Sequence, residues 1–335
     1  MKTVFLAIEE ARPGPRWASL AASFWPGYRK WFLREGESAR PSAEKGRQAL
    51  EAHMPELVPT YHRLVELMPD DPLVPRALSL YCPTPYLTGC SQAVWGRPPA
   101  RLIRNYDYSP VLWEGLLLHS SWTGSKVIAM SDCLWGALDG INEHGLAVSL
   151  TFGGSREIGP GFGIPLIVRY VLETCRTTQE AVRALTRIPC HMAYNVTALD
   201  RAGRYVTVHL APRVAAVVTD EPVATNHQAV GGWLRYVEAS GSIDRKRLLR
   251  ERVEDGEETE ARFLQRFFEP PLFSHRYEGG WGTLYTADYA VREGTARYFW
   301  PGQPELVEHV DSFREEERLL RYSDRKAAQE RRTIS

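Results

Sequence analysis

The sequence predicts an α+β protein in which two antiparallel sheets are covered on both sides by pairs of helices. The main observation is the order of the expected elements: strands, a helix pair, strands, a second helix pair and strands. This order differs from the strict alternation of strand and helix that builds a doubly wound parallel sheet. The composition agrees, since 44% of the 335 residues are hydrophobic and 24% are charged, which is ordinary for one large or two small globular domains. No GxGxxG, Walker or HExxH motif is present, so a nucleotide-binding or zinc-protease fold is not indicated.

Residues 1–89 are expected to form a helical N-terminal segment. Apolar residues recur at helical spacing over 17–33 and again over about 42–67. Two prolines within the second stretch should break or kink it, because proline removes a helical hydrogen bond. The five prolines between 69 and 85 indicate a connector that holds a short helix around 76–80.

The remainder of the chain, 90–335, is dominated by short β-rich segments with turn residues between them. Strands are expected at 92–95, 101–106, 115–121, 125–130, 137–141, 146–152, 194–199, 205–210, 214–218, 222–224, 283–289 and 295–299. Amphipathic helices are expected at 164–174, 178–186, 243–253 and 257–268. Pro165 suits the first turn of the first of these helices, and Thr178 is expected to cap the second. The charged tail from about residue 312 is interpreted as a solvated face or a frayed end.

Charge and cysteine content narrow the classes of function. The 41 basic and 41 acidic residues give a formal net charge of +0, which provides no overall electrostatic footprint for nucleic acid or an anionic membrane. The five cysteines are odd in number and show no C-x-x-C spacing, so we expect neither a disulfide framework nor a zinc site. The apolar run at 4–8 is too short for a signal peptide, and no stretch approaches the ~18 apolar residues of a membrane span. We therefore expect a cytoplasmic protein without a bound metal or prosthetic group.

Cys90 is the first candidate for chemistry. Gly89 precedes it and gives the backbone conformational freedom, and the thiol would project from the start of a strand. The next strand carries Arg104 and Asp107, and a cation near a thiol lowers the thiol pKa and raises the thiolate fraction. Because residues two apart share a strand face, Arg104 and Asp107 would need a bulge or a strand end to reach the same thiol. The competing interpretations are a buried packing cysteine and a surface ion pair.

Asn226 is the second candidate. It lies in Thr225-Asn226-His227, directly after the expected strand 222–224, where its amide could donate to a developing oxyanion. An Asx-turn is the competing interpretation. The histidines of the main domain show no i, i+4 metal spacing and are expected to be structural or exposed.

Several short motifs, taken together and in their order along the chain, resemble the acyl-coenzyme A:6-aminopenicillanic acid acyltransferase family, a branch of the N-terminal-nucleophile hydrolases. The chain is also similar, more distantly, to the bile-salt hydrolase and penicillin V acylase family. The matching pieces are Gly89-Cys90-Ser91, Arg104-Asn105-Tyr106-Asp107, 140–148 (GINEHGLAV), the helix pair 164–186, 194–200 (YNVTALD) with Gly203, Thr225-Asn226-His227 and 282–285 (GTLY). They follow the family's order and approximate spacing and cover about Cys90 to Pro301.

The resemblance implies a four-layer αββα sandwich, in agreement with the element order above. It also implies a precursor that cuts its own Gly89–Cys90 bond by an N-to-S acyl shift, so that Cys90 becomes a new N-terminus. Residues 90–335 would then be the catalytic domain. The segment 1–89 would be a pro-segment or a small helical subunit that stays associated, because its apolar helix faces need a partner.

The resemblance further implies roles for the catalytic residues. The new α-amino group of Cys90, with an ordinary pKa of roughly 7.7–8.0, would act as general base for the thiol of the same residue. That thiol would attack an amide or thioester carbonyl and form an acyl-enzyme. Asn226 would donate to the oxyanion, Asp107 would hold the amino group, and Arg104 would stabilise the thiolate.

Two positions depart from the family's pattern. Thr151 stands where an oxyanion-side asparagine is common. Gly280 and Trp281 stand where the family has an arginine just before the Gly-Thr-Leu strand. Either Arg276 reaches into the site or the substrate differs.

The sequence thus predicts a self-processing cysteine amidohydrolase or acyltransferase that acts on a linear amide or an acyl thioester through an acyl-Cys90 intermediate. Substrate contacts are expected from Thr151, Phe152 and Trp281, with the acyl pocket between Trp281 and the glycine-rich loop 153–163. The expected partners are a small acyl compound and the protein's own N-terminal fragment, with no nucleic acid or membrane and with homo-oligomerisation left open. The alternatives are an unprocessed, non-catalytic relative that binds an acyl compound, and a papain-like protease that depends on a histidine.

Overall fold

Two β-sheets packed face to face form the centre of the computed structural model, which describes residues 1–229 and 232–324. Within the described residues, the larger sheet consists, in spatial order, of β10 (Val217–Thr219), β9 (Tyr205–Leu210), β8 (Tyr194–Leu199), β7 (Ala147–Phe152), β6 (Gly136–Asn142), β5 (Val127–Asp132), β4 (Leu116–Ser120), β1 (Lys2–Glu9) and β15 (Glu316–Arg321). The smaller sheet consists of β11 (Val223–Ala224), β2 (Gly89–Trp95), β3 (Arg101–Tyr108), β12 (Gly282–Ala290), β13 (Thr295–Phe299) and β14 (Leu306–His309). Neighbouring strands are antiparallel, apart from the parallel pair of β1 and β4. The two sheets meet where β2 and β3 pack against β7.

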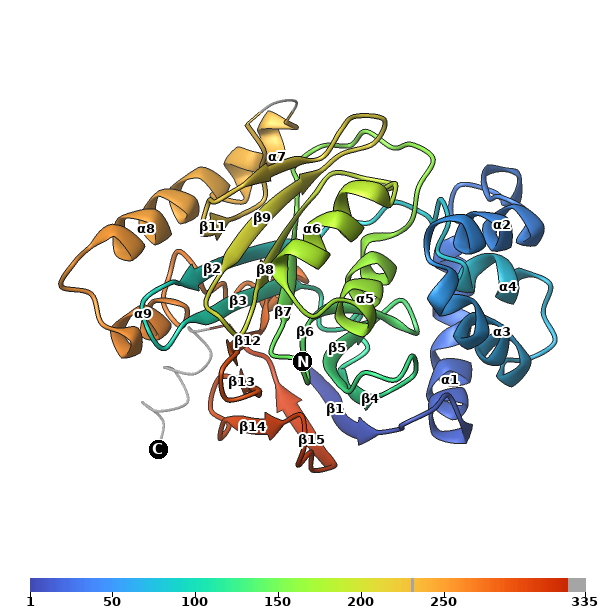
Figure 1. Ribbon diagram of the computed structural model, residues 1–335, viewed down its shortest axis with the longest axis horizontal. Coiled ribbons are helices and arrows are strands. Elements are labelled where there is room, and N and C mark those ends of the chain that lie inside the picture. The colour runs from blue at the N-terminus through green and yellow to red at the C-terminus, as the bar shows by residue number, and fades with distance from the viewer. Residues whose placement is uncertain (230–231, 325–335) are drawn as a thin grey trace.

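Helices cover the outer face of each sheet and complete the four αββα layers (Figure 1). α5 (Ile164–Thr174) and α6 (Thr178–Arg187) pack on the larger sheet, where α5 contacts β5, β6 and β7. α8 (Ser242–Glu254) packs on β2 and β11 of the smaller sheet. The ring of Phe263 in α9 (Glu260–Arg266) lies against Trp95 of β2. The predicted fold is therefore confirmed, including both expected helix pairs, and a short α7 (Leu234–Ala239) is an addition to it.

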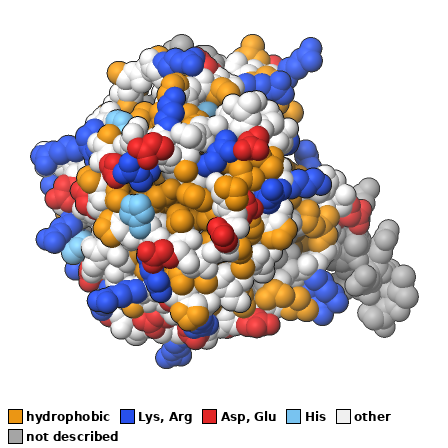
Figure 2. All heavy atoms as spheres, turned by 90° about the vertical axis from the view of Figure 1, so that its right-hand side faces the viewer, with side chains coloured by type: hydrophobic (Ala, Val, Ile, Leu, Met, Phe, Trp, Pro, Cys, Tyr) orange, Lys and Arg blue, Asp and Glu red, His pale blue; other side chains and the backbone are white. Residues whose placement is uncertain are grey.

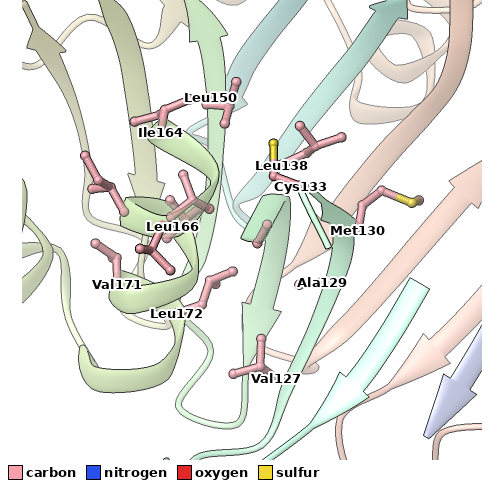
Figure 3. Close-up of a cluster of buried hydrophobic side chains, with 14 of the residues drawn as sticks. Val127, Ala129, Met130, Cys133, Leu138, Leu150, Ile164, Leu166, Val171 and Leu172 are labelled. Carbon is pink, nitrogen blue, oxygen red and sulfur yellow. The ribbon is translucent and has the colours of Figure 1, made fainter. Parts of the chain in front are cut away.

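The apolar side chains of α5 explain why this helix is buried on the larger sheet. Figure 3 shows Ile164, Leu166 and Leu172 of α5 in one cluster with side chains of β5, β6 and β7. Pro165 lies in the first turn of α5, as expected from its fixed φ angle. The expected cap of α6 is wrong by one residue: the side chain of Thr177 accepts the capping hydrogen bond, and the hydroxyl of Thr178 instead donates to Asp200.

The N-terminal helices gather at one end of the molecule, away from α8 and α9 (Figure 1). They are α1 (Pro15–Phe32), α2 (Ala43–His53), α3 (Val58–Leu67) and α4 (Leu73–Leu78), with short 3-10 turns at Glu37–Ala39 and Pro55–Leu57. Another 3-10 turn, Tyr277–Gly279, lies far along the chain, just before β12. The predicted break within the second helical stretch is confirmed, because α2 ends before Pro55 and α3 begins at Val58. Figure 2 shows this end with acidic and basic side chains interspersed among apolar ones. Throughout the described ranges, none of the helices combines the length and the apolar character needed to cross a bilayer.

The two ends of the chain differ from the sequence-based expectation, because each contributes a strand to the larger sheet. β1 lies between β4 and β15, pairing with β15 from Lys2 to Ala7 and with β4 from Leu6 to Glu9. The charged tail, expected to be a solvated face or a frayed end, instead contributes the edge strand β15, in which Glu317 and Arg321 are exposed and Glu316 and Arg318 are half-buried. Charged side chains are a common way to protect a sheet edge. The last part of this tail, 325–335, lies outside the described residues. Residues 1–89 are therefore helical in most of their length and still supply an interior strand to the main sheet.

Phe5 is a direct test of how strongly β1 is anchored. Its side chain is fully buried and contacts the rings of Trp113 and Trp300. We expect Phe5→Ala to lower the free energy of unfolding by about 3–5 kcal/mol, because the substitution leaves a cavity in the core. Urea unfolding measures this in a Cys90→Ala background, in which the expected self-cleavage does not split the chain. Val4→Ala, at a side chain that is 48% exposed, is the matched control, and equal losses for both variants would contradict an interior β1.

Candidate active site

The register between β2 and β3 decides which side chains meet Cys90. Cys90 lies opposite Tyr106, and Gly89 lies opposite Asp107. Side chains alternate along a strand, and directly paired residues point to the same face of a sheet. Arg104 therefore shares the face of Cys90, whereas Asp107 points to the other face. The two charged residues singled out in the sequence approach Cys90 from opposite faces of β2.

The thiol of Cys90 lies between the two sheets, on the face that also carries Arg104. Nη2 of Arg104 donates to Sγ at 3.2 Å, and the hydroxyl of Thr88 lies 3.8 Å from the same sulfur. The guanidinium is itself held by the carboxylate of Asp139 and by the backbone carbonyl of Leu138 at 2.7 Å. All of these side chains are buried. The contacts with Asp139 and Leu138 therefore fix the orientation of Arg104 toward the sulfur.

The carboxylate of Asp139 is shared between Arg104 and two tyrosines of β12. Tyr285 donates its hydroxyl to Asp139 at 2.5 Å, and Tyr289 donates to the other carboxylate oxygen. Burial raises the pKa of the Cys90 thiol, and the nearby Arg104 acts against that rise. In the intact chain the thiol is therefore held in its protonated form beside a fixed cation.

The backbone of Cys90 is clamped on the other side by Asn226 and Arg245. The N–H of Cys90 donates to Oδ1 of Asn226 at 2.9 Å, and the carbonyl of Cys90 accepts from Nη1 of Arg245 at 2.7 Å. Arg245 also donates to Oδ1 of Asn226 at 2.8 Å and to the hydroxyl of Ser91 at 2.6 Å. One guanidinium thus fixes both the backbone of Cys90 and the amide of Asn226 beside it.

Asp107 belongs to this same backbone side of the site. Its carboxylate accepts from the hydroxyl of Thr283 at 2.6 Å and lies 3.8 Å from Nη1 of Arg245. Burial raises the pKa of Asp107, and Arg245 opposes that rise. The pairing of β3 with β2 is regular, and Asp107 does not reach the thiol; a register shift is present instead in β12, between Thr283 and Tyr285. Asp107 is therefore positioned beside the Gly89–Cys90 peptide, not beside the sulfur.

The position of Asn226 depends on polar residues in the larger sheet. Asn195 donates to the carbonyl of Thr225 at 2.9 Å and to the hydroxyl of Thr151 at 3.0 Å, and Thr151 donates to the same carbonyl at 2.9 Å. Nδ2 of Asn226 has only long contacts, 3.4 Å to the carbonyl of Thr88 and 3.5 Å to that of Phe152. Thr151 thus supports the loop that presents Asn226, and the donor end of Asn226 is loosely held.

A cavity of about 1100 Å³ opens beside Gly89 and Asp107. Its apolar wall includes Leu87, Phe273 and Trp281. Arg276, which was one expected source of positive charge, is exposed and lines this cavity. The arginine that contacts the backbone of Cys90 is the buried Arg245.

The other expected substrate-binding elements lie further from this cavity. Phe152 is fully buried, and its ring packs edge-on against Tyr236, which lines the cavity. Of the described lining residues, none comes from the glycine-rich loop 153–163. That loop is instead fixed locally, where the carbonyl of Gly154 accepts from the N–H of Trp233. The cavity therefore contains Trp281 but is walled by α7, α8 and the segment before β12.

Within the described residues, the cysteines and acidic side chains form no cluster of the kind that binds a metal. All five cysteines are free, and across the described ranges no group of three or more His, Cys, Asp or Glu side chains could hold a metal ion. The chemistry that this arrangement supports is nucleophilic attack by a thiol with cationic assistance.

Several residues of this site were missed in the sequence analysis, including Asp139, and Arg245 and Asn195 show why. Arg245 lies in an otherwise charged helix pattern, and only its burial, with 3% of its surface exposed, separates it from its neighbours. Asn195 occupies a strand position that the sequence marks only as part of 194–200. The sequence offered a single indication of Asn195, namely that a polar residue stands within a strand that is otherwise largely apolar.

Comparison with known proteins gives a family match. The family model described as acyl-coenzyme A:6-aminopenicillanic acid acyl-transferase matches residues 96–305. This range covers more than half of the chain, includes Arg104, Asp107, Asn226 and Arg245, and begins just after Cys90. No protein among the curated sequences matches the chain.

Several solved structures are similar to the chain at low sequence identity. A mutant of the conjugated bile acid hydrolase from Clostridium perfringens is 11% identical, with a TM-score of 0.46 over 70% of this chain and 98% of that chain. Penicillin V acylase from Agrobacterium tumefaciens is 14% identical, with a TM-score of 0.45 over 68% and 90%. A Caenorhabditis elegans orthologue of N-acylethanolamine-hydrolyzing acid amidase is 16% identical, with a TM-score of 0.43 over 70% and 100%.

The buried ion pair of Arg104 and Asp139 should contribute to the stability of the fold. We expect Asp139→Asn to lower the free energy of unfolding by about 3–5 kcal/mol, because removing one partner leaves a buried charge uncompensated. Urea unfolding in the Cys90→Ala background measures the loss. Asp311→Asn breaks an exposed ion pair with Lys126 and should leave the urea midpoint unchanged. If Asp139→Asn behaves like this control, Asp139 does not balance Arg104.

Proposed function

The chain belongs to the acyl-coenzyme A:6-aminopenicillanic acid acyltransferase family, and we propose that it is a self-processing cysteine amidohydrolase or acyltransferase. Its substrate would be a small linear amide or acyl thioester, and the acyl group would pass through a thioester on Cys90. One observation carries the proposal: the nitrogen of Cys90 is bound to Asn226 at 2.9 Å while its sulfur accepts from Arg104 at 3.2 Å. A residue whose nitrogen and sulfur are both held in polar contacts is suited to use one as base and the other as nucleophile.

The first reaction would be cleavage of the chain itself. Sγ of Cys90 attacks the carbonyl carbon of Gly89, the C–N bond breaks, and the thiol proton passes to the departing nitrogen of Cys90. Water then hydrolyses the resulting thioester and leaves Cys90 with a free α-amino group. The site favours a glycine at this position, since a Cβ at Gly89 would lie 3.0 Å from Cβ of Asp107 and 3.2 Å from Trp281.

In the second reaction the α-amino group takes the thiol proton of the same residue. Arg104 stabilises the thiolate, which attacks the substrate carbonyl. Nδ2 of Asn226, with only long contacts in the intact chain, donates to the developing oxyanion, a role worth roughly 3–4 kcal/mol. The substrate's C–N or C–S bond then breaks, and the amine or thiol departs with the proton that the α-ammonium group holds. Water or an amine finally accepts the acyl group from Cys90.

Arg245 would supply the positive charge that the family's pattern places just before the Gly-Thr-Leu strand, where this chain has Gly280 and Trp281. A cation close to the new α-amino group disfavours its protonated form and so lowers its pKa. The carboxylate of Asp107, 3.8 Å from Arg245, holds that cation and the amino group in place. The departure at Trp281 would therefore be compensated from α8.

The N-terminal fragment would remain bound after cleavage. β1 is paired on both sides within the larger sheet, and the indole N–H of Trp17 donates to the carbonyl of Leu134 at 2.8 Å.

Five free cysteines are typical of a reducing compartment, which supports placing the enzyme in the cytoplasm.

The decisive experiment is denaturing mass spectrometry of the purified protein. We expect two fragments that split between Gly89 and Cys90 and that co-elute on gel filtration without denaturant. Cys90→Ala should remain a single chain of 38.0 kDa and lose all acyl transfer, because both reactions use this sulfur. Cys175→Ala, at another buried cysteine, is the control and should cleave normally. An intact wild-type chain that forms no acyl adduct on Cys90 would support the alternative of a non-catalytic acyl-binding protein.

The proposed role of Arg245 predicts that its removal shifts the pH dependence of kcat/KM. Removing the cation with Arg245→Gln should raise the pKa of the α-amino base, so the rising limb of kcat/KM against pH should move up by about one unit. Arg245→Lys should restore much of that shift, because it restores the charge. Hydrolysis of N-acyl p-nitroanilides provides the assay, with the exposed Arg247→Gln as control. A loss of activity with an unmoved limb would show a purely structural role for Arg245.

A further inference from the structure

The segment Leu87-Thr88-Gly89 is the acyl side of the bond that Cys90 would attack. If the chain cleaves itself, this segment is the first acyl group to occupy the site, and the groups that hold it are the ones that a later substrate would meet. The inference below therefore rests on the proposed function and asks which acyl group these contacts fit.

A hydrogen-bond donor faces the acyl side at a fixed distance from the reacting carbonyl. The hydroxyl of Tyr236 donates to the carbonyl of Thr88 at 2.8 Å, and that carbonyl carbon is three bonds from the carbonyl carbon of Gly89. The ring of Tyr236 is held between Phe152, edge-on at 5.3 Å, and Trp233, stacked at 5.3 Å. Once the end of the N-terminal fragment withdraws, this hydroxyl loses its acceptor, and a partly buried donor without a partner is costly.

The position next to the reacting carbonyl is narrow and favours an unbranched carbon. A side chain on Gly89 would begin 3.0 Å from Cβ of Asp107 and 3.2 Å from Cζ2 of Trp281. Cβ of Asp107 is fixed to β3, and the outer ring of the Trp281 indole lies edge-on against Tyr108. A substrate with a branch at this carbon would have to displace one of them.

Beyond the second carbonyl the cavity is large, and its lining combines an apolar wall with charged side chains, among them Glu238, Arg276 and Glu278. Leu87 is one of its lining residues, together with Pro270, Pro271, Phe273 and Trp281, and its volume of about 1100 Å³ exceeds the space that one leucine side chain needs. An aliphatic or aromatic group attached to the second carbonyl would extend into this space.

We propose that the acyl donor is an N-acylglycyl compound, with an unbranched α-carbon, a second carbonyl that accepts from Tyr236, and an apolar group in the cavity. Sγ of Cys90 forms a thioester with the glycyl carbonyl, and the C–N bond to the leaving amine breaks. The amine departs with a proton from the α-ammonium group of Cys90. Water then hydrolyses the thioester and releases an N-acylglycine.

Three p-nitroanilides test this proposal on the self-cleaved protein. N-hexanoylglycine p-nitroanilide has all the expected features, N-hexanoyl-L-alanine p-nitroanilide adds the branch, and nonanoyl p-nitroanilide keeps the chain length without the second carbonyl. We expect kcat/KM for the glycyl probe to exceed that for each of the others about 10-fold. Tyr236→Phe should reduce the glycyl-to-nonanoyl ratio about 5-fold, whereas Tyr108→Phe, which changes a neighbouring ring against Trp281, should keep the wild-type ratio.

The outcomes separate this proposal from the proposed function. If nonanoyl p-nitroanilide is turned over as well as the glycyl probe, and Cys90→Ala abolishes both activities, the N-acylglycyl subsite is wrong while the enzyme assignment stands. A protein that cleaves itself at Gly89 but hydrolyses none of the three probes also overturns the subsite. A chain that stays intact and hydrolyses none of them contradicts the proposed function itself.

Discussion

The pairing of β2 with β3 sets Cys90 opposite Tyr106 and Gly89 opposite Asp107, and the division of the site into two faces follows from that register. The sulfur points between the sheets toward Arg104, while the backbone nitrogen and carbonyl are bound from the side of α8. A slip of one residue would exchange these faces, placing the thiol under α8 and the guanidinium of Arg104 beside a different side chain. The buried position of both strands explains how so specific a register is maintained.

Each face carries one buried cation with its own carboxylate. Arg104 pairs with Asp139 between the sheets, and Arg245 lies 3.8 Å from Asp107 under α8. Because each charge is balanced locally, both guanidinium groups can be buried without a large desolvation cost remaining uncompensated. The same balance limits how strongly Arg104 can act on the sulfur, which agrees with the raised pKa of Cys90 in the intact chain. A free α-amino group beside the thiol would then be the missing component for reactivity.

The sequence is informative where function depends on neighbours along the chain and weak where it depends on distant segments. Gly89 and Cys90 stand at a visible junction between a proline-rich connector and a strand, so the candidate nucleophile could be found from local pattern. Arg245 could not, because its helix is charged throughout and only the packing of α8 on β2 selects this one residue for burial. β1 and β15 were missed for a related reason: each strand is stabilised mainly by pairing with a segment about three hundred residues away.

The N-terminal segment is attached to the rest of the molecule almost up to the proposed cleavage point. The N–H of Cys82 donates to the carbonyl of Gly161 at 2.8 Å, and the next residues are held within the segment, where Thr84 donates to the carbonyl of Phe32 at 3.0 Å and Arg34 donates to that of Pro85 at 2.9 Å. Only the few residues after Pro85 would therefore be released when the Gly89–Cys90 bond breaks. Their withdrawal would uncover Tyr236 and the cavity beside Trp281 while β1 and the N-terminal helices stay in place. Cleavage would in this way create both the catalytic base and the space for an acyl group, since a single peptide bond blocks both in the intact chain.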